Sequence, residues 1–328
     1  MDIFLDADNL KSLMIAYANM ADDDYQSEVR KMLKKYIDIH FSCNIQGLDV
    51  SARDMFISIF LNGRGNTGLE WMSKQPYRPI KHFDFHKSDT YPNKYLSSIY
   101  MLQESSEVLS KSLSPLLFSG VGLELDTINK LMITYGEYSK SYKVKNLKRW
   151  DDINEDVNIL PCTDIILCDN YIFTGYEEDN LYKLLTLLCS KTSKGEINIV
   201  IITKPTKQNQ LQLTDNDYND RNYQIKTKIK NELNKELKVT IIITAKQHDR
   251  YIITNYRYYT SGSSLNYFQK GRNIASGNTF EVKSLAHLET YNLAMEIITE
   301  FQRHIDNLIK LSSLHAIGDK KSNFFKFK

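Results

Sequence analysis

Apolar and polar positions follow a regular order in the second half of the chain. Short continuous apolar runs, rich in β-branched residues, alternate with segments whose apolar residues recur at helical spacing. Such runs are typical of buried strands, and such segments are typical of amphipathic helices. The expected strands are 164–173, 197–203, 239–244 and 251–259, and the expected helices are 180–191, 223–238 and 286–311. This alternation predicts an α/β fold in which helices flank a mixed sheet.

The first half of the chain has weaker patterning but also predicts an α/β unit. A strand is expected at 3–7, helices are expected at 27–39 and 97–112, and 51–62 fits either structure. Charge replaces periodic apolar residues after Trp150, in the run DDINEDV, which marks a domain boundary near residue 155. The predicted organisation is two domains, 1–155 and 156–312, followed by a basic, mobile tail at 313–328.

A long polar segment, 204–222, separates the expected strand at 197–203 from the next helix. Loops of this length are usually functional or disordered. The segment leaves the carboxyl end of a strand, where ligands of open α/β sheets usually bind. We therefore expect a substrate-facing loop, with plain disorder as the alternative.

Composition limits the classes of protein and of partner. The chain has 328 residues, of which 42% are hydrophobic and 25% charged, as in an ordinary globular protein. Its net charge is only +2, so a nucleic-acid site would need a local basic patch. The cysteines Cys43, Cys162, Cys168 and Cys189 form no C-x-x-C pair, which indicates reduced, buried thiols. Without a basic leader or an apolar stretch of about 18 residues, we expect a cytoplasmic protein with no integral membrane association.

The segment after the strand at 239–244 carries the strongest chemical signal, spaced H-x-R-x4-N-x6-G-S-x-x-N. The residues of this pattern are His248, Arg250, Asn255, Gly262, Ser263 and Asn266. His248 and Arg250 are two apart in an extended segment and so point to the same side. The small-residue turn at 261–264 lets backbone N–H groups approach an anion. A nucleophile candidate, a fixed cation and neutral donors therefore suit a phosphate ester, the alternative being a structural histidine before an ordinary turn.

This pattern resembles the phospholipase D superfamily signature, H-x-K-x4-D-x6-G-S-x-x-N. Arg250 stands where that family has lysine, and Asn255 stands where it has aspartate. Within 156–312, HDRYI and SLNYFQKGR resemble the phospholipase D-like C-terminal domain of MIT-domain proteins, whose motif also begins HDR. The resemblance implies a half-barrel-like α/β sandwich in which two motifs meet at one site. Because no G-S-x-x-N follows His82 and His86, it also implies a homodimer through the C-terminal domain.

The resemblance implies a metal-independent phosphodiesterase without a cofactor, acting on nucleic acid as a nuclease. His248 would attack phosphorus and form a phosphohistidine, and the same residue of a second copy would protonate the leaving oxygen. Arg250, Ser263 and Asn266 would stabilise charge on the phosphoryl oxygens. The residues expected to bind phosphate or nucleic acid around them are Lys246, Asn255, Arg257, Gly262, Lys270 and Arg272. Interleaved tyrosines are expected to stack on bases: Tyr251, Tyr256, Tyr258, Tyr259 and Tyr267.

The alternative to an enzyme is a catalytically degenerate domain, because the MIT-type branch is regarded as a binding domain. Such a domain would hold a phosphate group of nucleic acid or of a lipid headgroup, or would mediate assembly with partner proteins. The domain type alone suggests a nuclease of bacterial defence.

The N-terminal domain resembles no family strongly and is a candidate for binding a protein partner. Its opening, FLDADNL, faintly resembles PIN- or NYN-type nucleases, in which strand ends carry acidic metal ligands. Asp6, Asp8 and Asp49 would then gather Mg²⁺. The preferred interpretation is a strand end whose aspartates form a turn and cap a helix.

Overall fold

The structure is a computed structural model, and its described residues are 2–5, 7–18, 38–41, 50–51, 54, 98–101, 117–118, 135–136, 139–156, 162–174, 178–189, 196–208, 211–245, 249–268 and 277–328. The chain divides into two units, Met1–Glu137 and Tyr138–Lys328. Each unit is α/β, as the sequence predicts.

The first unit contains a four-stranded parallel sheet in the order β2-β1-β3-β4. Its elements are β1 (Asp2–Leu5), α1 (Ala7–Ala18), β2 (Asp38–Phe41), β3 (Ser98–Met101) and β4 (Leu117–Phe118). The predicted N-terminal strand is confirmed. The predicted helices at 27–39 and 97–112 are wrong where they overlap β2 and β3, because both segments pair with β1. Asp8 lies in the first turn of α1, whereas Asp6 and Asp49 lie outside the described residues.

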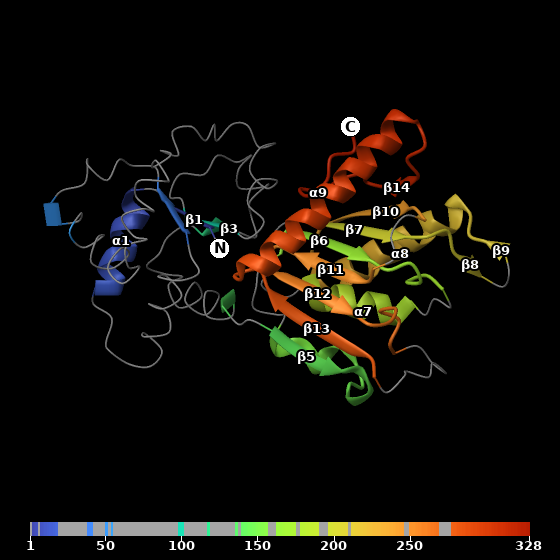
Figure 1. Ribbon diagram of the computed structural model, residues 1–328, viewed down its shortest axis with the longest axis horizontal. Coiled ribbons are helices and arrows are strands. Elements are labelled where there is room, and N and C mark those ends of the chain that lie inside the picture. The colour runs from blue at the N-terminus through green and yellow to red at the C-terminus, as the bar shows by residue number, and fades with distance from the viewer. Residues whose placement is uncertain are drawn as a thin grey trace. The chain divides into compact units, whose positions relative to one another are not determined.

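The second unit is built on an eight-stranded mixed sheet in the order β14-β10-β7-β6-β11-β12-β13-β5 (Figure 1). The strands are β5 (Ser139–Lys143), β6 (Asp164–Cys168), β7 (Ile197–Thr203), β10 (Leu237–Ile243), β11 (Tyr251–Thr254), β12 (Arg257–Ser261), β13 (Thr279–Ser284) and β14 (Ala316–Gly318). The three central strands β6, β7 and β10 are parallel, and the other neighbours pair antiparallel. Parallel strands covered on both faces are continuous apolar runs, which is why the sequence predicts them well.

Three helices and a small hairpin complete the described part of the unit. They are α7 (Glu178–Cys189), β8 (Lys207–Gln208), β9 (Leu211–Gln212), α8 (Asp215–Leu233) and α9 (Leu288–Lys310), with 3-10 turns η6 (Val144–Asn146) and η7 (Trp150–Asp156). The segment expected to be a loop at 204–222 thus contains a hairpin and the start of α8. Thr214 caps α8: its hydroxyl accepts a hydrogen bond from the Asp217 N–H, and the Asp217 carboxylate accepts from the Thr214 N–H. The helix ends at Leu233 and is capped by Asn234, which has a left-handed conformation.

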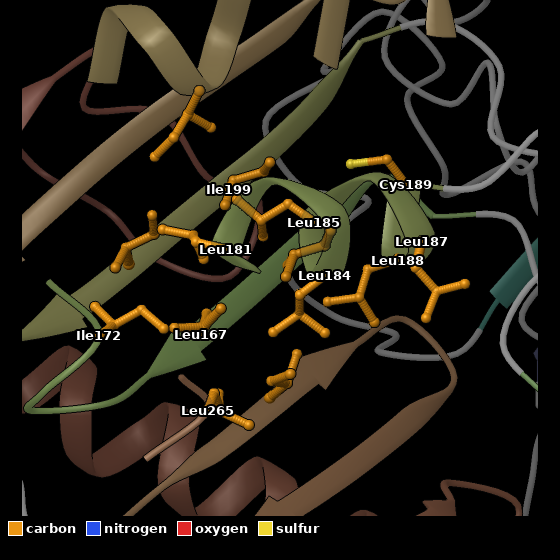
Figure 2. Close-up of a cluster of buried hydrophobic side chains, with 14 of the residues drawn as sticks. Leu167, Ile172, Leu181, Leu184, Leu185, Leu187, Leu188, Cys189, Ile199 and Leu265 are labelled. Carbon is orange, nitrogen blue, oxygen red and sulfur yellow. The ribbon is translucent and has the colours of Figure 1, made fainter. Parts of the chain in front are cut away.

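One face of the sheet packs against α7 and α8. Alternate strand residues such as Leu167 and Ile199 join Leu181 and Leu185 of α7 in a continuous apolar cluster (Figure 2). Ile225 and Ile229 of α8 extend this cluster. The cluster therefore fixes the parallel strands and, with them, the edge at which they end.

The opposite face is covered by α9 and by the C-terminal segment, both drawn in red in Figure 1. Ile298 and Phe301 of α9 are buried, and Phe301 lies 5.4 Å from the ring of Phe325. The strand β14 pairs with β10, and the Asn323 N–H donates to Asp164 Oδ1 at 2.7 Å. The final residues are therefore part of the fold, and the expected mobile tail at 313–328 is corrected by these contacts.

The second unit also begins earlier than residue 155. Strand β5 pairs along β13, and Trp150 is 1% exposed in the core. The charged run DDINEDV forms most of η7 and does not separate two domains. The sequence of the run predicts a domain boundary because a short 3-10 turn shows little apolar periodicity.

The buried carboxyl group of Asp164 predicts how stability depends on pH. Burial raises the pKa of Asp164 from 3.8 to about 6, although hydrogen bonds from Asn323 lower it. Between these values the folded chain binds more protons than the unfolded chain, so this group adds stability as the pH falls from 7 toward 4. Its contribution is about 3 kcal/mol. Urea unfolding should show that Asp164→Asn loses this part of the pH dependence, whereas the exposed Asp220→Asn keeps it; an unchanged slope in Asp164→Asn would contradict the assignment.

Candidate phosphate-binding site

The carboxyl ends of the three parallel strands bring polar residues to one edge of the sheet. Asp169 follows β6, Lys204 follows β7 and Thr244 follows β10. Backbone hydrogen bonds tie these ends together, since the Asp169 N–H donates to the Ile202 carbonyl at 3.0 Å and the Thr244 N–H donates to the Thr203 carbonyl at 2.8 Å. Ligands of open α/β sheets characteristically bind at this edge.

Two cations flank one exposed aromatic ring at this edge. The ammonium of Lys204 lies 3.7 Å from the ring centroid of Tyr171, and the guanidinium carbon of Arg250 lies 5.6 Å from the same centroid. Both distances fall within the range of cation–π contact. Tyr171 is 39% exposed, and Lys204 beside it lowers the pKa of its phenol. We call Tyr171, Lys204 and Arg250 the cation–tyrosine platform.

Arg250 contributes its charge to this platform, while its acidic neighbour acts elsewhere. Asp249 precedes β11, and successive residues of an extended chain point to opposite sides. Burial and, less strongly, the charge of Asp249 raise the pKa of Tyr258 to about 12. By contrast, Arg250 acts on Tyr171 and Asp169, lowering the pKa of both. The platform is therefore locally positive although the chain as a whole is nearly neutral.

The small-residue turn does not offer its donors to a ligand in the way that the sequence predicts. The Gly262 N–H donates to the Thr279 carbonyl at 3.2 Å, and the Ser263 N–H donates to the Ser261 hydroxyl at 3.2 Å. The Ser264 hydroxyl and the Leu265 N–H both donate to Asp169 Oδ2 at 2.7 Å. The backbone N–H groups of Gly262 and Ser263 are thus engaged within the domain, and an internal carboxylate binds the two residues that follow them.

Asn255 is buried, with 4% of its surface exposed, and its side chain bonds within the domain. Its Oδ1 accepts hydrogen bonds from the backbone N–H groups of Thr163 at 2.8 Å and Asp164 at 3.2 Å. Its Nδ2 donates to the Thr163 hydroxyl at 2.9 Å. The side chain therefore fastens the start of β6 beside the β11–β12 turn, at the end of β6 opposite to the carboxyl edge.

Asn266 is 2% exposed and also bonds within the domain. Its Nδ2 donates to the Tyr171 carbonyl at 2.7 Å and to the Thr174 carbonyl at 3.4 Å. Asn180 of α7 donates to the Leu265 carbonyl at 3.0 Å and accepts from the indole N–H of Trp150 at 3.1 Å. These contacts hold the motif turn against the Tyr171 loop.

Of the remaining expected contacts, those that the structure describes do not converge on the platform. Arg257 is 3% exposed within β12. The tyrosines expected to stack on bases fill the core and are all buried: Tyr251, Tyr256, Tyr258, Tyr259 and Tyr267. His248, Lys246, Lys270 and Arg272 lie outside the described residues. The structure thus brings Arg250 and the turn with Ser263 to the same hairpin end, where the Ser261 N–H donates to the Arg250 carbonyl at 3.1 Å.

Three residues at this edge were not singled out from the sequence: Asp169, Tyr171 and Lys204. A signal for them exists, because Asp169 and Lys204 directly follow the apolar runs DIILC and INIVIIT. A polar residue directly after a buried parallel strand is placed at the carboxyl edge whatever motif surrounds it. Tyr171 is harder to find, since its role depends on the turn that β6 enters.

The described residues contain neither a candidate metal site nor a membrane-spanning helix. Within that part of the chain, no three His, Cys, Asp or Glu side chains group so that they could hold a metal ion. No described helix is both long enough and apolar enough to cross a membrane.

Comparison with known proteins identifies the domain that carries the platform. A search of curated proteins gave no match. One similar solved structure is that of TrmBL2, an archaeal chromatin protein, which shows a novel mode of DNA binding; the two chains are 15% identical, each is covered over 60% of its length, and the TM-score is 0.28. A TM-score of 0.28 is too low to indicate a shared fold. Residues 157–291 match a protein family, the phospholipase D-like domain at the C-terminus of MIT, so the C-terminal region of this chain carries a phospholipase D-like domain of that family.

Proposed function

We propose that the C-terminal unit binds the phosphate groups of single-stranded nucleic acid through the cation–tyrosine platform and does not cleave them. The observation that carries this proposal is the exposed ring of Tyr171 beside two cations. Exposed aromatic rings stack on bases, and neighbouring cations pair with the phosphates between those bases. A lipid headgroup would use the cations but would leave the aromatic ring without a partner.

Binding without cleavage is favoured because Asn266, one of the expected catalytic donors, and the turn residues that follow Ser263 are engaged inside the domain. Asn266 bonds to two backbone carbonyls, and the Ser264 hydroxyl and Leu265 N–H bond to Asp169. A phosphoryl-transfer site needs donors aimed at the oxygens on which charge develops. The guanidinium of Arg250 lies at the edge beside Tyr171, where it could pair with a phosphate.

The second candidate is metal-independent cleavage by His248 in a homodimeric site. The motif spacing and the position of Arg250 at the carboxyl edge favour it. This candidate predicts a phosphohistidine, activity in EDTA and complete loss of turnover in His248→Ala. The binding proposal predicts that neither the wild type nor His248→Ala cleaves the nucleic acid.

A labelled oligothymidylate, followed by fluorescence anisotropy and by gel electrophoresis in EDTA, tests the two candidates together. Arg250→Ala should weaken binding roughly 10- to 100-fold, because it removes a charge-assisted contact worth about 1.5–3 kcal/mol. Arg303→Ala, which removes a charge from an exposed position of α9, is the matched control and should bind like the wild type. His248→Ala should bind normally.

The same experiment contains the outcomes that reject the proposal. Cleavage that is abolished in His248→Ala would establish the second candidate. Binding to anionic vesicles, with none to the oligonucleotide, would indicate a lipid headgroup. Phosphate contacts lose affinity as ionic strength rises. If neither salt nor Arg250→Ala weakened binding of the oligonucleotide, phosphate recognition would be rejected, and a role in protein assembly would be the remaining interpretation.

A further inference from the structure

A buried carboxylate joins the two segments that meet at the platform. Asp169 is 0% exposed and directly follows β6. Its Oδ1 accepts the Tyr171 N–H at 2.8 Å, and its Oδ2 accepts the Ser264 hydroxyl and the Leu265 N–H, each at 2.7 Å. One side chain therefore holds both the loop that presents Tyr171 and the turn that follows β12.

Burying the Asp169 carboxylate costs free energy, which its hydrogen-bond donors offset. Burial raises the pKa of Asp169, while the hydrogen bonds from Ser264, Tyr171 and Leu265 and the charge of Arg250 lower it. An ionised carboxylate without partners is strongly disfavoured in an apolar interior. The short charge-assisted bonds to Tyr171 and to the turn therefore act together, and the loss of the carboxylate would release both segments at once.

We infer that Asp169 is the positioning residue of the cation–tyrosine platform: it sets the ring of Tyr171 against Arg250 by binding the Tyr171 loop and the Ser264–Leu265 turn to one carboxylate. The inference rests on the proposed function, since the platform is the site of that function. It adds a residue that contacts no ligand and yet decides how tightly the ligand binds.

Two other roles for Asp169 predict different results. If Asp169 acted mainly through its charge, its removal would raise the positive potential around Arg250 and strengthen phosphate binding. Three hydrogen bonds of 2.7 to 2.8 Å join the carboxylate directly to the two segments, so we expect positioning to dominate. If Asp169 were merely structural, its removal would lower stability without acting through Tyr171.

The same strand provides a matched control. Asp164 begins β6, is 1% exposed and accepts two hydrogen bonds from Asn323, at 2.7 and 2.6 Å. Like Asp169, it is a buried carboxylate with a raised pKa that binds a distant segment, but it lies at the other end of the strand. Asp164→Asn therefore reproduces the loss of a buried charge without touching the platform.

The experiment combines amide hydrogen exchange with binding of the labelled oligothymidylate in the full chain. Asp169→Asn should speed exchange at the Tyr171 and Leu265 amides and weaken binding roughly tenfold or more. Asp164→Asn should leave both amides and the affinity unchanged. Tyr171→Ala should weaken binding, and adding Asp169→Asn to it should cause little further loss, because coupled residues are not additive.

Ser264→Ala is a milder variant for the case in which Asp169→Asn does not fold. It removes one of the three donors and should cause a smaller loss of binding that is again absent in the Tyr171→Ala background. Tighter binding, unchanged exchange at both amides, or a loss that simply adds to that of Tyr171→Ala would each overturn the positioning role. Absence of oligothymidylate binding by the wild type would reject the proposed function itself, and the positioning role with it, whereas the exchange data would still show whether Asp169 holds the two segments.

Discussion

Replacing Lys204 and Arg250 together with alanine is expected to abolish measurable binding of single-stranded nucleic acid. Each cation stands over or beside the same ring, so both face one ligand position. Two charge-assisted contacts at about 1.5–3 kcal/mol each amount to a loss of roughly 3–6 kcal/mol. In fluorescence anisotropy at low salt, this corresponds to a decrease of at least about 100-fold in affinity.

A matched double variant separates this effect from the loss of net charge. Lys228 also lies over a tyrosine ring, 5.8 Å from the centroid of Tyr182, and Arg303 lies on an exposed position of α9. Lys228→Ala with Arg303→Ala removes the same charge but leaves the platform intact, so it should bind almost like the wild type. Equal losses in the two double variants would show that binding follows overall charge, and the platform would then have no special role.

The second large effect is expected on stability. Trp150→Ala should lower the free energy of unfolding by about 3–5 kcal/mol, as large-to-small changes of buried aromatic residues do. The Trp150 ring lies 5.4 Å from that of Tyr267, 5.2 Å from Phe268 and 5.5 Å from Phe280. Its N–H also donates to Asn180 Oδ1, so the variant leaves a cavity and removes one of the two hydrogen bonds that this oxygen accepts.

Urea unfolding of the full chain measures this change. Tyr223→Ala, at a position 71% exposed on α8, is the surface control and should alter stability by less than about 0.5 kcal/mol. If Trp150→Ala unfolded like the control, residues 150–156 would not belong to the core of the second unit. That result would favour the boundary near residue 155.

The fold of the second unit could be predicted where the pattern is local. The runs at 197–203 and 239–244 correspond to β7 and most of β10, because strands buried on both faces need continuous apolar sequence. By contrast, β5 and β13 were missed: the exposed SKSYK and the alternating TFEVKS acquire strand structure through their pairing with each other and, for β13, with β12. Such pairing joins segments far apart in the sequence and leaves no strong local signal.

In the candidate site, too, the sequence predicted local features but not contacts between distant segments. The motif predicted that Arg250 and the turn with Ser263 lie at one end of a hairpin, and they do, since residue spacing is a local property. It could not show that Asp169, from a strand about 95 residues earlier, accepts the donors of its turn. Nor could it show that the neighbouring tyrosines are buried, because the sequence alone does not reveal which side of a strand faces the core.

The order of strands across the sheet has a consequence for the synthesis of the chain. The two edges are β5 and β14, which are the first and the last strands of the second unit in sequence. While the chain is translated, the apolar strand LKVTIII has its neighbour β7 on one side but no partner on the other until residues 316–318 have left the ribosome. An open edge of this kind readily pairs with another chain. A transcript cut short within α9 would therefore yield a product prone to aggregation and degradation, although every residue of the cation–tyrosine platform had already been made.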